Sequence, residues 1–168
     1  MDNLTLIGIG TGNPDQLTFE GARASQEATT ILSPRKGGEK SDLADLRRQI
    51  VEKVVVGNGQ QIIEFDLPVR KSDGDYLENV DLWHDAIADA WIKAAGNTER
   101  AALLIWGDPS LYDSSLRIAS RLKPYPKVRV VAGITTLPVL TAAHSIPLNE
   151  IGAPFVVTTG RRLRENCL

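Results

Sequence analysis

The stretch L-T-L-I-G-I-G-T-G-N-P, residues 4–14, joins a short apolar run to closely spaced glycines. An apolar run that ends in Gly-x-Gly-x-Gly is typical of a buried strand entering a tight turn. Pro14 stands near the first turn of a helix that we expect over Asp15–Ala28, where proline is well tolerated. A strand, a glycine turn and a helix in this order predict the first unit of an α/β domain.

The same alternation continues along the chain. Further strands are expected at residues 29–32, where Ser33-Pro34 stops the strand, and at 62–67, 101–106 and 128–132. Residues 35–40 (R-K-G-G-E-K) are interpreted as a basic loop. Helices are expected at residues 41–54, 75–95 and 135–143, and from the turn at 107–109 to about Lys123. This order predicts an α/β fold, an open and mostly parallel sheet with helices on both faces.

The end of the chain departs from this pattern. Residues 147–154 are interpreted as a linker, Phe155–Thr159 as a sixth strand and Arg161–Asn166 as the start of a helix. We therefore expect an N-terminal α/β domain over residues 1–146. Residues 147–168 are expected to be a linker and the start of a second α/β domain, most of which is missing.

Composition and charge exclude several functions. The 168 residues carry a net charge of −2, which gives no electrostatic basis for binding nucleic acid. No apolar run approaches the roughly 20 residues that a membrane-spanning helix needs, and Asp2 does not fit a signal peptide. Cys167 is the only cysteine, which excludes internal disulfides and cysteine metal sites. These features predict a soluble, cytoplasmic protein without a bound metal.

Three predicted strand ends are rich in turn residues: 8–13, 107–109 and 133–136. Ligands of open α/β sheets bind outside the carboxyl ends of the strands, so three such loops favour a binding site. A dinucleotide site fits poorly, because Asn13 stands at the third glycine position and no acidic residue ends the second strand. A phosphate-binding P-loop motif is also absent from the sequence.

Several polar residues have both a structural and a functional interpretation. Asp108 either binds ribose hydroxyls, orders its loop or acts as an ordinary turn aspartate. Thr135 and Thr136 either contact a ligand or cap a helix. His84 lies beside the apolar stripe of the long helix, which favours a structural role, and His144 suggests no particular function.

Three ordered motifs resemble the tetrapyrrole (corrin/porphyrin) methylase family. L-I-G-I-G-T-G-N-P-D-Q-L-T at 6–18 resembles its opening signature, and W-G-D-P-S-L-Y-D-S at 106–114 resembles its second motif. A-G-I-T-T at 132–136, followed by H-S-I-P-L at 144–148, resembles its third. The resemblance extends over about residues 4–163. Thr11 and Ala132 stand where many relatives have proline.

The resemblance implies a two-domain homodimer with S-adenosyl-L-methionine (product S-adenosyl-L-homocysteine) bound between the domains. The cofactor contacts carried over by position are Thr11, Gly107, Asp108, Leu111, Thr135 and Thr136. G-x-E-K at 37–40, L-R-R at 46–48, L-W-H at 82–84, P-L-N-E-I-G at 147–152 and T-T-G-R-R-L at 158–163 resemble one branch of the family in particular. This resemblance implies a role in cobalamin biosynthesis, the conversion of precorrin-5 to precorrin-6A. This conversion adds a methyl group at ring carbon C1 and releases acetate.

Methyl transfer from a sulfonium mainly requires alignment of the reacting atoms, so no catalytic residue is assigned. Precorrins carry many carboxylates, and charge matching makes Arg35, Lys36, Lys40 and Arg47 candidate substrate-binding residues. A solvated basic face is the alternative for these four. Two other functions stay open: a methyltransferase of the same fold for a different precorrin, and a catalytically incomplete fragment of such an enzyme.

Overall fold

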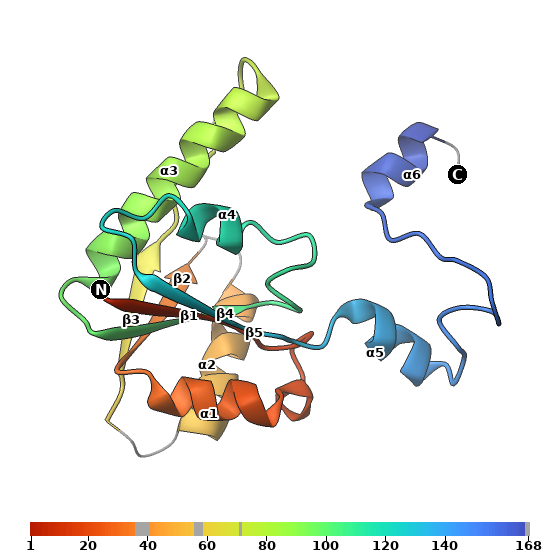
Figure 1. The fold of residues 1–168 in the computed structure, drawn as a ribbon, viewed down its shortest axis with the longest axis horizontal. Helices are drawn as coiled ribbons and strands as arrows, with labels where there is room; N and C mark the ends of the chain where they lie inside the picture. Colours follow the sequence, from red (N-terminus) through yellow and green to blue (C-terminus); the bar gives the residue numbers. More distant parts are fainter. Residues whose placement is uncertain (36–40, 56–58, 71, 167–168) are drawn as a thin grey trace. The chain divides into compact units, whose positions relative to one another are not determined.

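The computed structural model describes residues 1–35, 41–55, 59–70 and 72–166. Its centre is a five-stranded parallel sheet with the strand order β3-β2-β4-β1-β5 (Figure 1). The strands are β1 (Asn3–Gly8), β2 (Thr30–Arg35), β3 (Gln61–Asp66), β4 (Arg100–Ile105) and β5 (Lys127–Val131). The predicted α/β fold with an open parallel sheet is confirmed.

Helices cover both faces of this sheet (Figure 1). One face carries α1 (Phe19–Glu27) and α2 (Ser41–Val55), and the other carries α3 (Tyr76–Ala95) and α4 (Ser115–Ala119). A short 3-10 helix, η1 (Pro14–Gln16), precedes α1. Asp75 begins α3 by accepting a hydrogen bond from the Glu78 amide at 2.8 Å, and Gly96 ends it, which agrees with the helix predicted over 75–95.

The core lies on the two sides of β1 and β4. Leu6 and Ile7 are neighbours in β1 and both are fully buried, yet they belong to different apolar clusters. Successive side chains of a strand point to opposite faces, so Leu6 packs toward α3 and α4 while Ile7 packs toward α1 and α2. Each buried side chain of this size contributes about 1.5–3 kcal/mol to folding. The two apolar layers fix β1 and β4 in the middle of the sheet.

Strand β2 continues through Ser33 and Pro34, so the prediction that these residues stop it was wrong. Its pairing with β4 ends at Leu32, whereas its pairing with β3 continues to Arg35. Proline lacks an N–H, but on the β4 side no ladder bond is needed beyond Leu32. The cost of a proline in the strand is therefore avoided.

The helix predicted over Asp15–Ala28 is broken in two. Leu17 and Thr18 have extended backbone angles between η1 and α1. The Thr18 hydroxyl oxygen accepts a hydrogen bond from the Gly21 amide at 3.0 Å and so begins α1 as an N-cap. Threonine caps are common, but the sequence alone did not separate this cap from the helix around it.

The helix predicted between residues 109 and 123 shrinks to α4, which has five residues. Tyr112 has a φ of 50°, a left-handed conformation that a helix cannot include. The Asp113 carboxylate accepts a hydrogen bond from the Ser115 amide at 2.6 Å at the start of α4. Local side-chain bonds to the backbone therefore replace the missing helical turns.

The chain divides into two compact units, Met1–Thr136 and Leu137–Leu168. The second unit contains most of α5 (Thr136–Ala143) and all of α6 (Gly160–Asn166). The sixth strand predicted over residues 155–159 is absent, so that prediction was wrong, whereas the helix predicted from Arg161 is present. Phe155 and Val156 are exposed, and no neighbouring strand of the described chain pairs with them. None of the helices over the described ranges is long and apolar enough to cross a membrane.

Candidate functional site

Three loops follow the carboxyl ends of the adjacent strands β4, β1 and β5, and we call residues 8–13, 107–111 and 132–136 the glycine edge. Their backbones approach too closely for side chains. A Cβ atom at Gly133 would lie 2.7 Å from the Cα of Gly8 and closer still to the Gly107 carbonyl oxygen. No side-chain rotation relieves such a clash with backbone atoms. The packing therefore requires glycine at Gly8 and at Gly133.

A backbone hydrogen bond joins the loops after β1 and β4. The amide of Gly107 donates to the carbonyl of Gly10 at 2.7 Å, and the two residues form an isolated antiparallel bridge. Gly107 has a φ of 65°, a conformation that favours glycine. Within the described chain, no atom lies within 4 Å of the position that its Cβ would take. The backbone at Gly107 is therefore open to the close approach of a ligand.

Asp108 joins the loops after β4 and β5. One carboxylate oxygen accepts a hydrogen bond from the Gly133 amide at 2.8 Å. The other accepts from the amide of Ser110 at 2.8 Å and from the Ser110 hydroxyl. Burial opposes ionisation of Asp108, but these hydrogen bonds outweigh it and lower its pKa below the ordinary value. Of the interpretations left open for Asp108, this geometry supports the ordering of the loops.

The other residues carried over as cofactor contacts lie on the same edge. Thr11 is exposed, and its hydroxyl donates to the Gln16 side-chain oxygen at 2.6 Å. Leu111 is 36% exposed on the loop after β4. Thr135 is half-buried and Thr136 is exposed at the start of α5. The structure thus brings all six residues to loops of three adjacent strands, and their role in binding stays a prediction.

Of the four predicted substrate-binding residues, the structure describes Arg35 and Arg47. Arg35 forms ion pairs with Glu64 at 3.3 Å and Asp66 at 3.4 Å. Arg47 is half-buried, and its guanidinium stacks on the Trp106 ring at 5.0 Å from the ring centroid. Lys36 and Lys40 lie outside the described residues.

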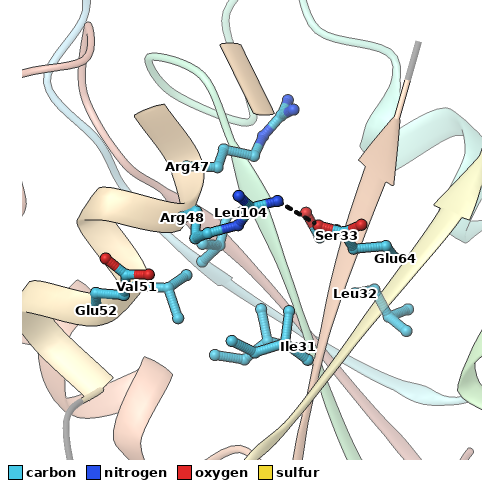
Figure 2. A pocket seen from close by; sticks show the side chains of 10 residues that line it. Ile31, Leu32, Ser33, Arg47, Arg48, Val51, Glu52, Glu64 and Leu104 are labelled. Carbon is cyan, nitrogen blue, oxygen red and sulfur yellow. Dashed lines mark hydrogen bonds and ion pairs between the residues drawn. The ribbon is translucent and has the colours of Figure 1, made fainter. Parts of the chain in front are cut away.

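A cavity of about 250 Å³ lies between α2 and the strands β2 and β3 (Figure 2). Arg48 donates to Glu64 at 3.0 Å there, and Glu64 also pairs with Arg35. Arg47 leaves the same helix, but its guanidinium extends away from the Arg48–Glu64 pair (Figure 2). Arg47 and Arg48 both line this cavity, and within it the charge of Arg48 is paired with Glu64.

Sequence reasoning missed several of the groups that shape this region. Ser110 was not singled out, although Asp-x-Ser in a turn is a known signal for side-chain to backbone bonds. Gln16 was also missed, and nothing in its local sequence shows that it would hold Thr11. The stacking of Arg47 on Trp106 depends on packing between α2 and the loop after β4, which no local pattern reveals.

The two histidines add no evidence for catalysis. His84 is 5% exposed, its ring lies 5.8 Å from that of Trp83, and burial lowers its pKa below the ordinary value. This placement agrees with the structural role expected for it. His144 lies in the second unit, after α5. Among the residues that the structure covers, no cluster of three or more His, Cys, Asp or Glu side chains could hold a metal ion.

The sequence matches one family model over nearly its whole length. Residues 3–167 match the model of the Tetrapyrrole (Corrin/Porphyrin) Methylases. The chain is also 41% identical, over 175 residues, to a precorrin-6A synthase (deacetylating) from Sinorhizobium sp. That alignment covers 99% of this chain and 67% of the relative.

Solved structures agree with this match. A cobalamin-synthesis-related protein (CobF) from Corynebacterium diphtheriae is 37% identical, with a TM-score of 0.76 over 99% of this chain and 67% of that one. A uroporphyrin-III C-methyl transferase from Thermus thermophilus, complexed with S-adenyl homocysteine, is 21% identical with a TM-score of 0.55. This second likeness shows the fold alone and covers 89% of this chain and 51% of that one. The chain therefore spans between half and two thirds of the length of these relatives.

Proposed function

The chain belongs to the tetrapyrrole methylase family, and we propose that it acts as a precorrin-6A synthase. The reaction is an S-adenosylmethionine-dependent C-methylation of precorrin-5 at ring carbon C1, and a water molecule is consumed when the acetyl group leaves as acetate. The observation that carries this proposal is the 41% identity to a precorrin-6A synthase over 99% of the chain. The 37% identity to a cobalamin-synthesis-related structure supports the same pathway.

The glycine edge is the proposed cofactor site. Its fit rests on the open space over Gly107, where a ligand can reach bare backbone, and on the exposed hydroxyl-bearing residues Thr11 and Thr136. S-adenosylmethionine supplies an electrophilic methyl group when bound. The proposed contacts are Thr11, Gly107, Asp108, Leu111, Thr135 and Thr136.

The contribution of the chain to this reaction is alignment. Displacement at a methyl group needs the reacting atoms held about 3–3.5 Å apart in line, and misplacement of an ångström is costly. Asp108 fixes the loop after β5 through the Gly133 amide, and Gly107 fixes the loop after β1 through Gly10. Loops held by such bonds need little reordering when a ligand binds, so less binding energy is lost.

We further propose that the enzyme works as a homodimer in the cytoplasm, as the family resemblance implies. Arg35, Lys36, Lys40 and Arg47 remain proposed contacts to substrate carboxylates. Arg35 would have to exchange its pairs with Glu64 and Asp66 for a substrate carboxylate. Exposed ion pairs of this kind are weak, so such an exchange is inexpensive.

The test of the proposed function is turnover of precorrin-5 by the purified 168-residue chain. We expect one methyl group transferred from labelled S-adenosylmethionine for each acetate released. Methylation of precorrin-2 or precorrin-4 in preference to precorrin-5 would assign the chain to a sibling reaction. A folded chain that transfers no methyl group to any of them would contradict an enzymatic function for this chain.

A further inference from the structure

A second cavity of about 250 Å³ lies on the other side of Arg47, toward α3 and α4. Trp83, Trp91 and Trp106 all line it, and the chain contains only these three tryptophans. We call it the tryptophan cavity. Trp106 directly precedes Gly107, so the cavity adjoins the glycine edge through a single peptide bond. Its volume is below that of most sites for whole cofactors and suits one small group of a larger ligand.

Three hydrogen-bond donors on residues that line this cavity are buried without a partner in the described structure. The indole N–H groups of Trp91 and Trp106 are buried and have no partner among the residues that the structure describes. The Nε–H of Arg47 is likewise buried and has no hydrogen-bond partner there. Indole and guanidinium groups donate and never accept, so only an acceptor on a ligand or a water molecule can satisfy them. Three buried donors without acceptors are unusual in one small region of a native protein.

The charge in the cavity also favours an anion. Arg47 has no carboxylate within 4.0 Å in the described part of the chain, whereas its neighbour Arg48 is paired with Glu64. The hydrogen bond from Nη1 of Arg47 to the Pro34 carbonyl is long, at 3.4 Å. Asp113 faces Arg47 and partly offsets its charge, but the Asp113 carboxylate already accepts the Ser115 amide at 2.6 Å. The guanidinium thus retains donors for a bidentate partner.

We propose that the tryptophan cavity binds a carboxylate group, held by Arg47 and by the indole N–H groups of Trp91 and Trp106. Two sources share this chemistry: a carboxylate side arm of the tetrapyrrole and a free short-chain carboxylate such as the released acetate. The identity of either ligand rests on the proposed function. The ability of the cavity to bind a carboxylate does not depend on that function. Apolar ring surface around a cation and N–H donors suits a group with a short hydrocarbon stem and a charged head.

Tryptophan fluorescence, excited where tyrosine does not absorb, reports on this cavity, because every tryptophan of the chain lines it. We expect sodium acetate and sodium propionate to change the emission of the 168-residue chain saturably, with a millimolar Kd. Sodium chloride at equal ionic strength is the control and leaves the emission unchanged. An emission that responds to both salts alike, or to neither, overturns the proposal.

The Kd values of single variants then test which side chains bind the carboxylate. Arg47→Gln raises the Kd for propionate at least tenfold, and Arg47→Lys restores part of the affinity by keeping the charge. Trp106→Phe keeps an aromatic ring but removes one N–H, and raises the Kd about threefold. Arg48→Gln is the matched control, since Arg48 lines the other cavity, and leaves the Kd within twofold. Circular dichroism checks each fold, and equal affinities of Arg47→Gln and Arg48→Gln would refute the role of Arg47.

Kinetics with precorrin-5 separates the two sources. If the cavity holds a side arm, Arg47→Gln raises KM more than it lowers kcat. If it holds free carboxylate, KM is unchanged and added acetate inhibits the parent chain more than the variant. Titration with S-adenosylhomocysteine on the same samples keeps the two proposals apart. If the chain binds S-adenosylhomocysteine but its emission does not respond to carboxylates, only the proposed carboxylate site is overturned. If the emission responds but the chain neither binds the cofactor nor turns over substrate, only the proposed function is overturned.

Discussion

Trp106 and Gly107 are adjacent residues, yet they belong to two regions that are built in different ways. The glycine edge is held by backbone atoms in contact and by one carboxylate that bonds to backbone amides. The tryptophan cavity is formed by long side chains from several elements, with buried donors that lack partners in the described structure. Backbone packing tolerates almost no substitution, whereas a side-chain cavity tolerates substitution but changes its ligand chemistry. The proposed roles follow this difference: alignment of the cofactor at the glycine edge and recognition of a carboxylate in the tryptophan cavity.

Among the predicted variants, Gly133→Ala in the glycine edge is expected to lose the most stability. The added Cβ would lie 2.7 Å from the Gly8 Cα, and a backbone cannot rotate away. We expect a loss of about 3 kcal/mol or more in the free energy of unfolding, measured by urea denaturation. Gly160→Ala is the control, because nothing in the described chain lies within 4 Å of its Cβ position, and its cost should stay within about 0.5 kcal/mol. Similar stabilities of the two variants would show that the loops are not in close contact.

Asp108→Asn tests the carboxylate that links the loops. The charged acceptor is lost, and we expect a cost of about 1–2 kcal/mol in unfolding free energy at pH 7. The pKa of Asp108 is lowered in the folded chain, so its stabilisation is present above about pH 4 and is lost as pH falls through the folded value. The parent and the variant should therefore converge in stability in acid. If the difference in unfolding free energy between the parent and Asp108→Asn stayed the same well below pH 4, the destabilisation would come from altered packing and not from the lost charge.

Arg48→Gln is expected to have the smallest effect. The Arg48–Glu64 pair is 3.0 Å long, and its side chains are 53% and 33% exposed. Exposed ion pairs contribute little, so we expect a change of at most about 0.5 kcal/mol in urea denaturation. A loss above about 1 kcal/mol would mean that the cavity between α2 and the strands β2 and β3 depends on this charge pair.

Much of the fold could be predicted because it depends on local pattern. The central strand β4 is a continuous apolar run after Arg100, and α3 has both a capping aspartate and a terminal glycine. The glycine edge was also visible in the sequence, since close contact between backbones requires glycine at Gly8 and Gly133, and a positive φ favours it at Gly107. The family motifs lie at these same positions.

The wrong predictions share a physical cause, which is that tertiary context decided between local alternatives. Pro34 stays within β2 only because β4 has stopped pairing at that point. The break at Thr18 and the shortness of α4 depend on side chains that bond to nearby amides. The contact of Arg47 with Trp106 joins residues far apart in sequence. No period or composition of the local sequence contains that information.

The most direct test of the central claim, that the glycine edge binds the cofactor, is calorimetric titration with S-adenosylhomocysteine. The parent chain, Asp108→Asn and Arg48→Gln should be compared under one set of conditions. The account predicts micromolar binding by the parent, about tenfold weaker binding by Asp108→Asn, which corresponds to about 1.4 kcal/mol, and no change for Arg48→Gln. A folded parent chain that does not bind, or an Asp108→Asn variant that binds as tightly as the parent, would contradict it.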